Sequence, residues 1–189
     1  RMGSNRLAPP APVLSLLESR AFFEFGAVVA ASPLLRLMGR GDRHPVLILP
    51  GFLAGDPSTA PLRSVLRSQG YWAHGWQLGR NLGPTPDVVD GLSERLQTLH
   101  ARHGRPVSLI GWSLGGIYAR RLARRSPEMV RQVITLGSPF RIAESGGRSA
   151  VSGIYERLRP AHSVGLEQTL PGDGEVPPVV PVTAVYTRT

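Results

Sequence analysis

Two kinds of apolar pattern alternate along the chain. Short, largely apolar segments, typical of parallel strands covered on both faces, occur at residues 45–51, 71–76, 106–111, 130–139 and 178–187. Longer segments between them repeat apolar residues at helical spacing, as at Val88, Leu92, Leu96 and Leu99. This alternation predicts an α/β protein with a doubly wound, mostly parallel sheet.

Local signals mark where the predicted helices begin and end. Asp56 and Pro57 are interpreted as a helix start, and Asp87 and Asp90 suit the positive end of a helix dipole. The segments 56–70 and 85–104 both close with a glycine, which is typical of a helix C-terminus. A further helix is predicted over residues 114–125.

The remaining segments suggest how the chain is organised. Residues 1–4 (RMGS) are interpreted as vector-derived, and residues 5–189 as one domain. Residues 13–38 are interpreted as an N-terminal helical segment, because apolar residues recur at helical spacing from Leu14 to Val28. The Gly- and Pro-rich stretch 141–178 interrupts the alternation of strand and helix; it is a lid insertion or, alternatively, a surface excursion without a partner.

The charge of the chain is strongly positive. Its 189 residues carry a net charge of +9, and all 22 basic residues are arginine. The arginines are scattered along the predicted helices, for example at Arg120, Arg121, Arg124 and Arg125, which suggests a solvated helix face and compositional bias. That scatter argues against a nucleic-acid partner, whereas contact with an anionic membrane surface or a lipid stays open.

Several classes of protein are disfavoured by composition. The chain has no cysteine, which excludes disulfides and thiolate metal sites, and no metal or organic cofactor is expected. The apolar stretch 21–31 contains Glu24 and is shorter than the ~20 residues of a membrane-spanning helix. No signal peptide is visible, so a cytoplasmic location is predicted.

The sequence GWSLGG, residues 111–116, places Ser113 where a predicted strand meets a predicted helix. Flanking glycines permit a sharp turn that lifts the serine hydroxyl above the sheet. An oxyanion formed there would meet the backbone N–H of Leu114, and a second donor is expected from Phe52, where Gly51 allows a close approach. The alternative is a glycine-rich turn that serves helix packing, with Ser113 as a spectator.

These motifs resemble a known family. VLILPGF, HGWQLGRNLGPTP, GWSLGG and RQVITLGSPF together resemble bacterial esterases and lipases of the α/β-hydrolase superfamily, over about residues 40–140 and the last predicted strand. The resemblance implies ester hydrolysis through an acyl-enzyme on Ser113, with a Ser–Asp/Glu–His triad in that chain order. Its substrate would be a small-molecule carboxylic ester, acylglycerol-like or with a short acyl chain.

Four of the five histidines have structural interpretations. His44 precedes the first strand and should lie at the far end of the sheet, away from Ser113. His74 lies inside the second strand, as a packed or edge residue. His100 and His103 lie near the C-terminus of one helix, where partial positive charge is favourable.

Partners for Ser113 are therefore few. His162, in the predicted lid, is a candidate base, and Glu144, after the fourth strand, is a candidate acid. Asp173 is interpreted as a turn residue. Lid residues such as Ile154, Tyr155 and Leu158 either line an acyl site or pack within a helix.

Trp112 is expected to be buried beside the serine.

The resemblance implies that the acid and histidine would normally follow the last strand, beyond AVYTRT. The chain is then the N-terminal part of a serine esterase, or a non-catalytic relative that binds acyl ligands or a partner. Acyl transfer at the same site is a third possibility. An uncovered sheet edge would favour a homodimer.

Overall fold

The computed structural model describes residues 40–138 and 178–185. The chain divides into two compact units, Arg1–Gly39 and Arg40–Thr189, and all described residues belong to the second. The predicted helical segment 13–38 and residues 141–177 of the predicted lid, with Glu144 and His162, lie outside the described residues.

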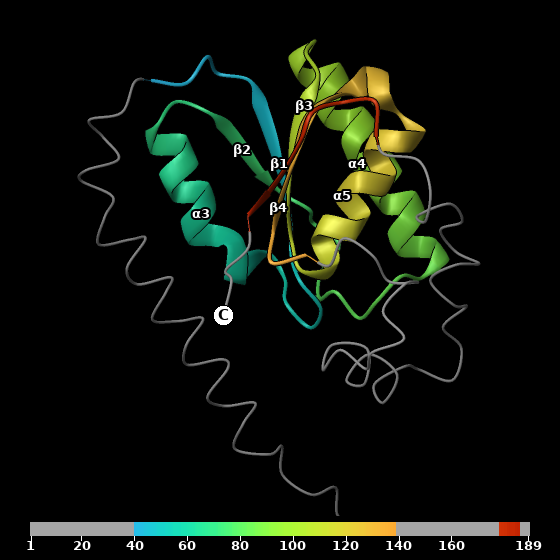
Figure 1. Ribbon diagram of the computed structural model, residues 1–189. Helices are drawn as coiled ribbons and strands as arrows, with labels where there is room; N and C mark the ends of the chain where they lie inside the picture. Colours follow the sequence, from blue (N-terminus) through green and yellow to red (C-terminus); the bar gives the residue numbers. More distant parts are fainter. Residues whose placement is uncertain (1–39, 139–177, 186–189) are drawn as a thin grey trace, which may run out of the picture. The chain divides into compact units, whose positions relative to one another are not determined.

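Five parallel strands form one sheet in the order β2-β1-β3-β4-β5 (Figure 1). All five predicted strands are present; four are shorter than the patterns suggested and β3 is shifted by one residue, because a strand ends where its ladder of backbone hydrogen bonds ends. Residues 178–181, for example, precede the last strand. The strands are β1 (Pro45–Leu49), β2 (Trp72–Gly75), β3 (Val107–Trp112), β4 (Val130–Leu136) and β5 (Val182–Val185).

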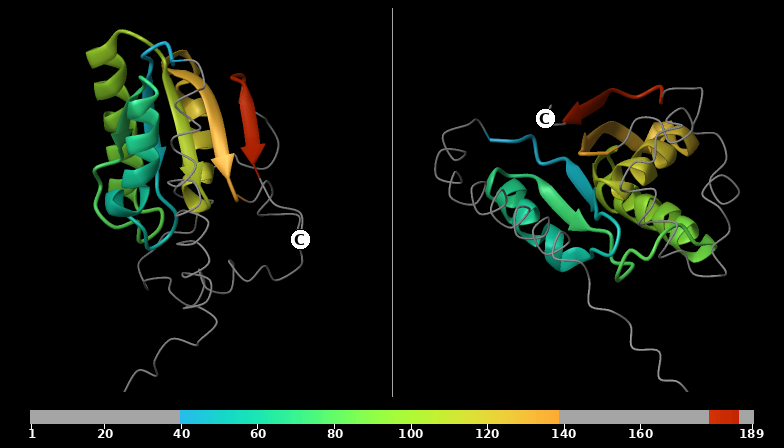
Figure 2. Two further views of the ribbon diagram at one scale, coloured as in Figure 1. Left: turned by 90° about the vertical axis from the view of Figure 1, so that its left-hand side faces the viewer. Right: turned by 60° about the horizontal axis from the view of Figure 1, so that its bottom comes forward.

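Each connection between the first four strands carries a helix. α3 (Asp56–Ser68) covers one face of the sheet, and α4 (Pro86–His103) and α5 (Leu114–Arg125) cover the other (Figures 1 and 2). A short 3₁₀ turn, η1 (Pro127–Met129), leads into β4. The doubly wound α/β architecture is therefore confirmed.

The strand β1, which lies between β2 and β3, shows how the sheet is buried on both faces. Leu47 and Leu49 pack into the larger apolar cluster with α4 and α5, while Val46 and Ile48 pack with the α3 side chains. All five residues of β1 are buried. A strand with two buried faces must be apolar at consecutive positions, and this explains the unbroken run in its sequence.

The helices also depart from the predicted pattern at a few positions. Val89, not Val88, is the buried valine of the α4 stripe. Arg120 and Arg121 were expected on a solvated face, but they are only 4% and 6% exposed. That prediction is wrong because α5 packs over both β3 and β4, which leaves little of its surface in water.

The outer strand β2 has its outward carbonyl groups occupied by arginines. Trp72 donates its N–H to His44 on the β1 side, so Ala73 and Gly75 point their backbone groups away from β1. The guanidinium of Arg67 donates to the Ala73 carbonyl at 3.0 and 2.7 Å. The guanidinium of Arg95 donates to the Gly75 carbonyl at 3.2 Å through two nitrogens.

Candidate active site

The order of the strands points to one end of the sheet as the functional end. The chain leaves β1 toward α3 on one face and leaves β3 toward α5 on the opposite face, although these strands are neighbours. In open α/β sheets such a reversal opens a crevice at the carboxyl ends of the two strands. The segments that border this crevice are the loop after Leu49 and the turn at Ser113.

Ser113 adopts a strained backbone conformation at this point. It lies between β3 and α5 with φ 52° and ψ −116°, a left-handed region that L-residues rarely occupy. Its N–H donates to the Leu136 carbonyl at 2.9 Å, and its carbonyl accepts from Gly116 N–H at 3.0 Å. Its side chain is half-buried, in contrast to its fully buried neighbour Leu114. Strain of this kind is expected in a nucleophile elbow.

The glycines around Ser113 are required by close backbone contacts. A Cβ on Gly111 would lie 2.3 Å from the Gly115 carbonyl oxygen. On Gly115 it would lie 2.2 Å from the Leu49 carbonyl oxygen, and on Gly116 it would lie 2.5 Å from Ser138 Cβ. Distances this short exclude any larger residue unless the backbone moves. The GxSxGG pattern is thus a packing requirement of a tight strand–turn–helix.

The loop after β1 passes directly beside the serine. A Cβ on Gly51 would lie 3.4 Å from the Trp112 carbonyl oxygen and 3.5 Å from Ser113 Cβ. The loop then turns tightly, with Ala54 N–H donating to the Gly51 carbonyl at 3.2 Å and Leu53 at φ 62°. Phe52 packs its ring against the larger core cluster.

The loop after β2 is bonded to the loop after β1. Leu53 N–H donates to the Asn81 carbonyl at 2.7 Å, and Asn81 N–H donates to the Ala54 carbonyl at 2.8 Å. Arg80 Nε also donates to the Leu53 carbonyl at 2.8 Å. Sequence reasoning used Arg80 and Asn81 only as part of a family motif, and it did not identify this connection.

Three exposed large apolar side chains lie in the loops after β1 and β2 and at the end of β3. Leu53 follows β1, Leu82 follows β2 and Trp112 ends β3, and their exposed fractions are 41%, 54% and 40%. We call these three residues the apolar rim. The expectation that Trp112 is buried is therefore wrong, because the strand has emerged from the covering helices at its last residue.

No histidine of residues 40–138 and 178–185 lies in a loop that follows a strand. His44 precedes β1, as predicted, at the opposite end of the sheet. There it forms a Ser–His–Asp constellation: Ser108 Oγ lies 2.8 Å from His44 Nε2, and His44 Nδ1 bonds the Asp42 carboxylate. Ser108 and His44 are 2% and 6% exposed. A substrate cannot reach this buried serine.

His74 and His103 form a separate pair between β2 and α4. Their Nε2 atoms are 2.9 Å apart, and Trp72 stacks on His103 with ring centroids 4.5 Å apart. Burial, together with the charges of His103 and nearby arginines, lowers the pKa of His74 to about 4. His74 is thus a packed strand residue, as expected, and it lies against α4 and not against Ser113.

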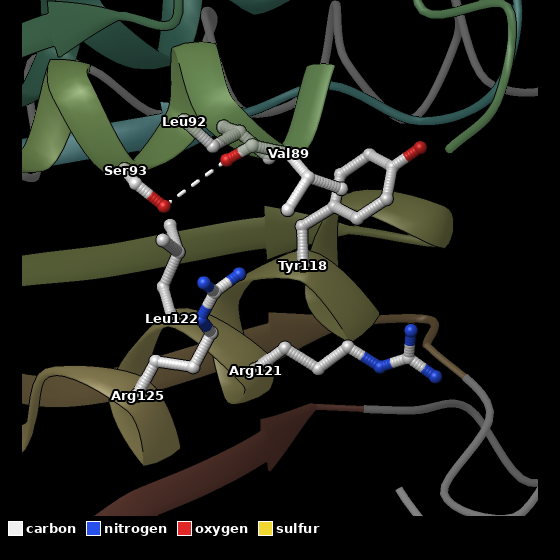
Figure 3. A pocket seen from close by; sticks show the side chains of 7 residues that line it. All are labelled: Val89, Leu92, Ser93, Tyr118, Arg121, Leu122 and Arg125. Atoms are coloured by element: carbon white, nitrogen blue, oxygen red, sulfur yellow. Dashed lines mark hydrogen bonds between the residues drawn. The ribbon is translucent and has the colours of Figure 1, made fainter. Parts of the chain in front are cut away.

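A shallow hollow lies between α4 and α5 (Figure 3). Apolar side chains of both helices and two arginines line it, and Ser113 and the loops after the strands are not among its walls. Within the described ranges there is also no group of three or more His, Asp or Glu residues placed to hold a metal ion. No helix of the described part is long and apolar enough to cross a membrane.

The chain has detectable similarity to known proteins. No family model matches it. It is 29% identical over 131 residues to "Serine hydrolase BPHL" of Mus musculus, which covers 65% of this chain and 43% of the relative. Its human counterpart is 29% identical over 130 residues, with 64% and 43% covered. The chain thus spans less than half the length of these curated relatives.

Solved structures with a related arrangement include hydrolases. A structure of Paleococcus ferrophilus monoacylglycerol lipase matches with a TM-score of 0.46 at 18% identity, over 71% of this chain and 51% of that one. A metagenome-derived lipolytic enzyme, from work on LipS and LipT, matches with a TM-score of 0.45 at 21% identity, over 57% and 46%.

The sequence similarity to serine hydrolases agrees with the parallel sheet and with the Ser113 turn described above. The parallel sheet and the turn at Ser113 have the arrangement of an α/β-hydrolase, and the sequence similarity is to serine hydrolases. The resemblance that the motifs indicated is confirmed. Within the described residues, the structure brings Ser113 and the two loops beside it together.

Proposed function

We propose that Ser113 is the nucleophile of a serine hydrolase that cleaves carboxylic esters through an acyl-enzyme. The observation that carries the proposal is the left-handed backbone of Ser113 at the strand–helix turn. Such strain is maintained only where the surrounding structure enforces it, and here three glycines in close contact do so. The names of the relatives, a serine hydrolase and lipolytic enzymes, support the same chemistry.

The proposed reaction proceeds in two steps. The Ser113 hydroxyl attacks the acyl carbon, a general base takes its proton, and the carbonyl oxygen becomes an oxyanion. The backbone N–H groups of Leu114 and Phe52 donate to that oxyanion, and the alcohol leaves with the proton. Water then attacks the acyl-enzyme in the same manner and releases the acid. The base and its acid partner come from outside the described residues, where His162 and Glu144 are candidates.

The apolar rim supports esters with an apolar acyl or alcohol part. The rim residues follow or end three different strands: Leu53 follows β1, Leu82 follows β2 and Trp112 ends β3. Each side chain is exposed at the end of the sheet that carries Ser113. Burying such side chains against a substrate chain contributes ~25 cal/mol per Å². Acylglycerol-like and short acyl esters fit this chemistry.

The experiment that tests the proposal is labelling with a fluorophosphonate, read by intact mass and peptide mapping on the full-length protein. We expect one adduct, on Ser113, and hydrolysis of short p-nitrophenyl esters. Ser113→Ala should lose both. Ser108→Ala is the matched control, because it removes a serine with His and Asp partners from the opposite end of the sheet.

Each result has a defined meaning. No adduct on the full-length protein overturns the proposal and favours a non-catalytic relative that binds acyl ligands. An adduct on Ser108 would also overturn it. Acyl transfer is separated from hydrolysis by adding an alcohol: a transferase gives mainly the new ester, whereas the proposed hydrolase gives mainly the free acid.

A further inference from the structure

Asn81 is a fully buried polar residue in the loop between β2 and α4. Its side-chain Nδ2 donates to the Pro50 carbonyl at 3.0 Å. Its Oδ1 accepts from Gly83 N–H and from the Tyr118 hydroxyl, each at 3.2 Å. The amide nitrogen therefore bonds the loop after β1, while the amide oxygen bonds its own loop and α5.

Asn81 forms hydrogen bonds on both sides of the loop segment that carries one proposed oxyanion donor, the Phe52 N–H. Its side chain holds Pro50, and its backbone holds Leu53 and Ala54 at 2.7 and 2.8 Å. Gly51 and Phe52 lie between these anchor points. Because the loop belongs to no helix or strand, these bonds determine where the Phe52 N–H points.

The same residue is bonded to the element that carries the other proposed donor. Tyr118 lies one turn after Leu114 in α5, is 1% exposed, and donates to Asn81 Oδ1. The positions of the Phe52 and Leu114 N–H groups are thereby linked through one amide group.

We infer that Asn81 is a positioning residue for the oxyanion hole, which it sets by joining the loop after β1 to α5. The inference rests on the function proposed for Ser113. Oxyanion donors act only within a narrow range of about 2.7–3.1 Å from the developing charge, so a small shift of the loop lowers the rate. An asparagine suits the place because it donates to one carbonyl and accepts from two donors at once.

The test compares three variants of the full-length protein. Asn81→Asp keeps the shape and the acceptor but places an oxygen against the Pro50 carbonyl. Tyr118→Phe keeps Asn81 on the loop and removes the hydroxyl that links Asn81 to α5. Ser108→Ala removes a buried hydrogen-bond partner at the opposite end of the sheet and serves as the control for a loss of stability.

We expect Asn81→Asp to lower kcat about tenfold to a hundredfold with KM nearly unchanged, and Tyr118→Phe to lower it severalfold. Affinity for a trifluoromethyl ketone, whose adduct places an oxyanion in the site, should fall in parallel with kcat. Affinity for a ground-state ester analogue should not change. Ser108→Ala should lower the melting temperature without changing kcat.

The outcomes distinguish this inference from the proposed function. A wild-type protein that neither labels nor hydrolyses esters overturns the function, and the inference with it. If the wild type is active and Asn81→Asp matches Ser108→Ala, with lower stability but an unchanged ketone-to-ester affinity ratio, only the positioning role is overturned. If Asn81→Asp does not fold, Tyr118→Phe decides by the same ratio.

Discussion

Two serines only five residues apart occupy opposite ends of β3 and have opposite environments. Ser108 has the hydrogen-bond partners of a catalytic triad, His44 and Asp42, but it is 2% exposed. No histidine of residues 40–138 and 178–185 is hydrogen-bonded to Ser113, but Ser113 lies half-buried on a left-handed backbone at the strand–helix turn.

The comparison shows that the partners of a serine do not by themselves indicate catalysis. Ser108 Oγ and His44 Nε2 are hydrogen-bonded, His44 Nδ1 bonds Asp42, and Gln132 donates to Ser108 at 3.3 Å. This buried network holds β1, β3 and β4 together. A nucleophile needs access, backbone donors for an oxyanion, and a base, and we propose that the turn at Ser113 provides the first two of these.

The largest expected effect is at the elbow. Gly115→Ala places a Cβ 2.2 Å from the Leu49 carbonyl oxygen, so the backbone must move. We expect a loss of about 3 kcal/mol or more in the free energy of unfolding and no labelling of Ser113. Gly104→Ala is the control: its φ of 59° is strained, but the space around it is open, and a cost of about 1–2 kcal/mol with normal labelling is expected. Urea denaturation and adduct mass measure both.

The next effect is at the buried triad-like network. Ser108→Ala leaves His44 Nε2 and the Gln132 amide without their buried partner, at a cost of about 1–3 kcal/mol in the free energy of unfolding. The rate at which a fluorophosphonate labels Ser113 should not change. A labelling rate reduced tenfold or more would show that the two ends of β3 are coupled and would break the comparison.

A smaller effect is expected from acid titration. The hydrogen bond from His44, with help from Arg131, holds the pKa of Asp42 well below its ordinary value of 3.8. Because the pKa is lower in the folded state, the stability that Asp42 contributes is present above pH 3.8 and is lost as pH falls below it.

The free energy of unfolding of the wild type should therefore approach that of Asp42→Asn as pH falls from about 4 to 2. His74, with its pKa near 4, titrates in both proteins, so the difference between them isolates Asp42. A difference that stays constant across this range contradicts the assignment.

The smallest effect concerns the apolar rim. Leu82→Ser removes an exposed apolar side chain and should leave stability unchanged. We expect kcat/KM to fall about three- to tenfold for octanoyl esters and hardly at all for acetyl esters, since each buried methylene contributes ~0.8 kcal/mol. Equal changes for both esters would show that Leu82 does not contact the acyl chain.

Much of the fold could be predicted from patterns along the chain. The unbroken apolar run of β1 and the periodic spacing of α4 correspond directly to burial, and the glycines mark where backbones touch. The bounds predicted for α5, residues 114–125, agree with the structure. Ser113 was predicted to be a nucleophile because its motif combines a strand, two glycines and a helix.

The remaining features depend on contacts that one sequence does not encode locally. His44 meets Ser108 only because β1 and β3 are neighbours in the register that pairs Val46 with Ser108. Asn81 links three segments through hydrogen bonds: the loop after β1, its own loop and α5. Arg120 is buried because α5 lies over two strands, although its charge alone suggested solvent exposure.

The arginines on β2 also affect how copies of the chain can meet. A neighbouring strand that added to this edge would have to donate to the Ala73 and Gly75 carbonyls, which the guanidinium groups of Arg67 and Arg95 already occupy. Displacing two charge-assisted bonds disfavours growth of the sheet in that direction. Concentrated solutions of the chain should therefore resist strand-by-strand aggregation on the β2 side.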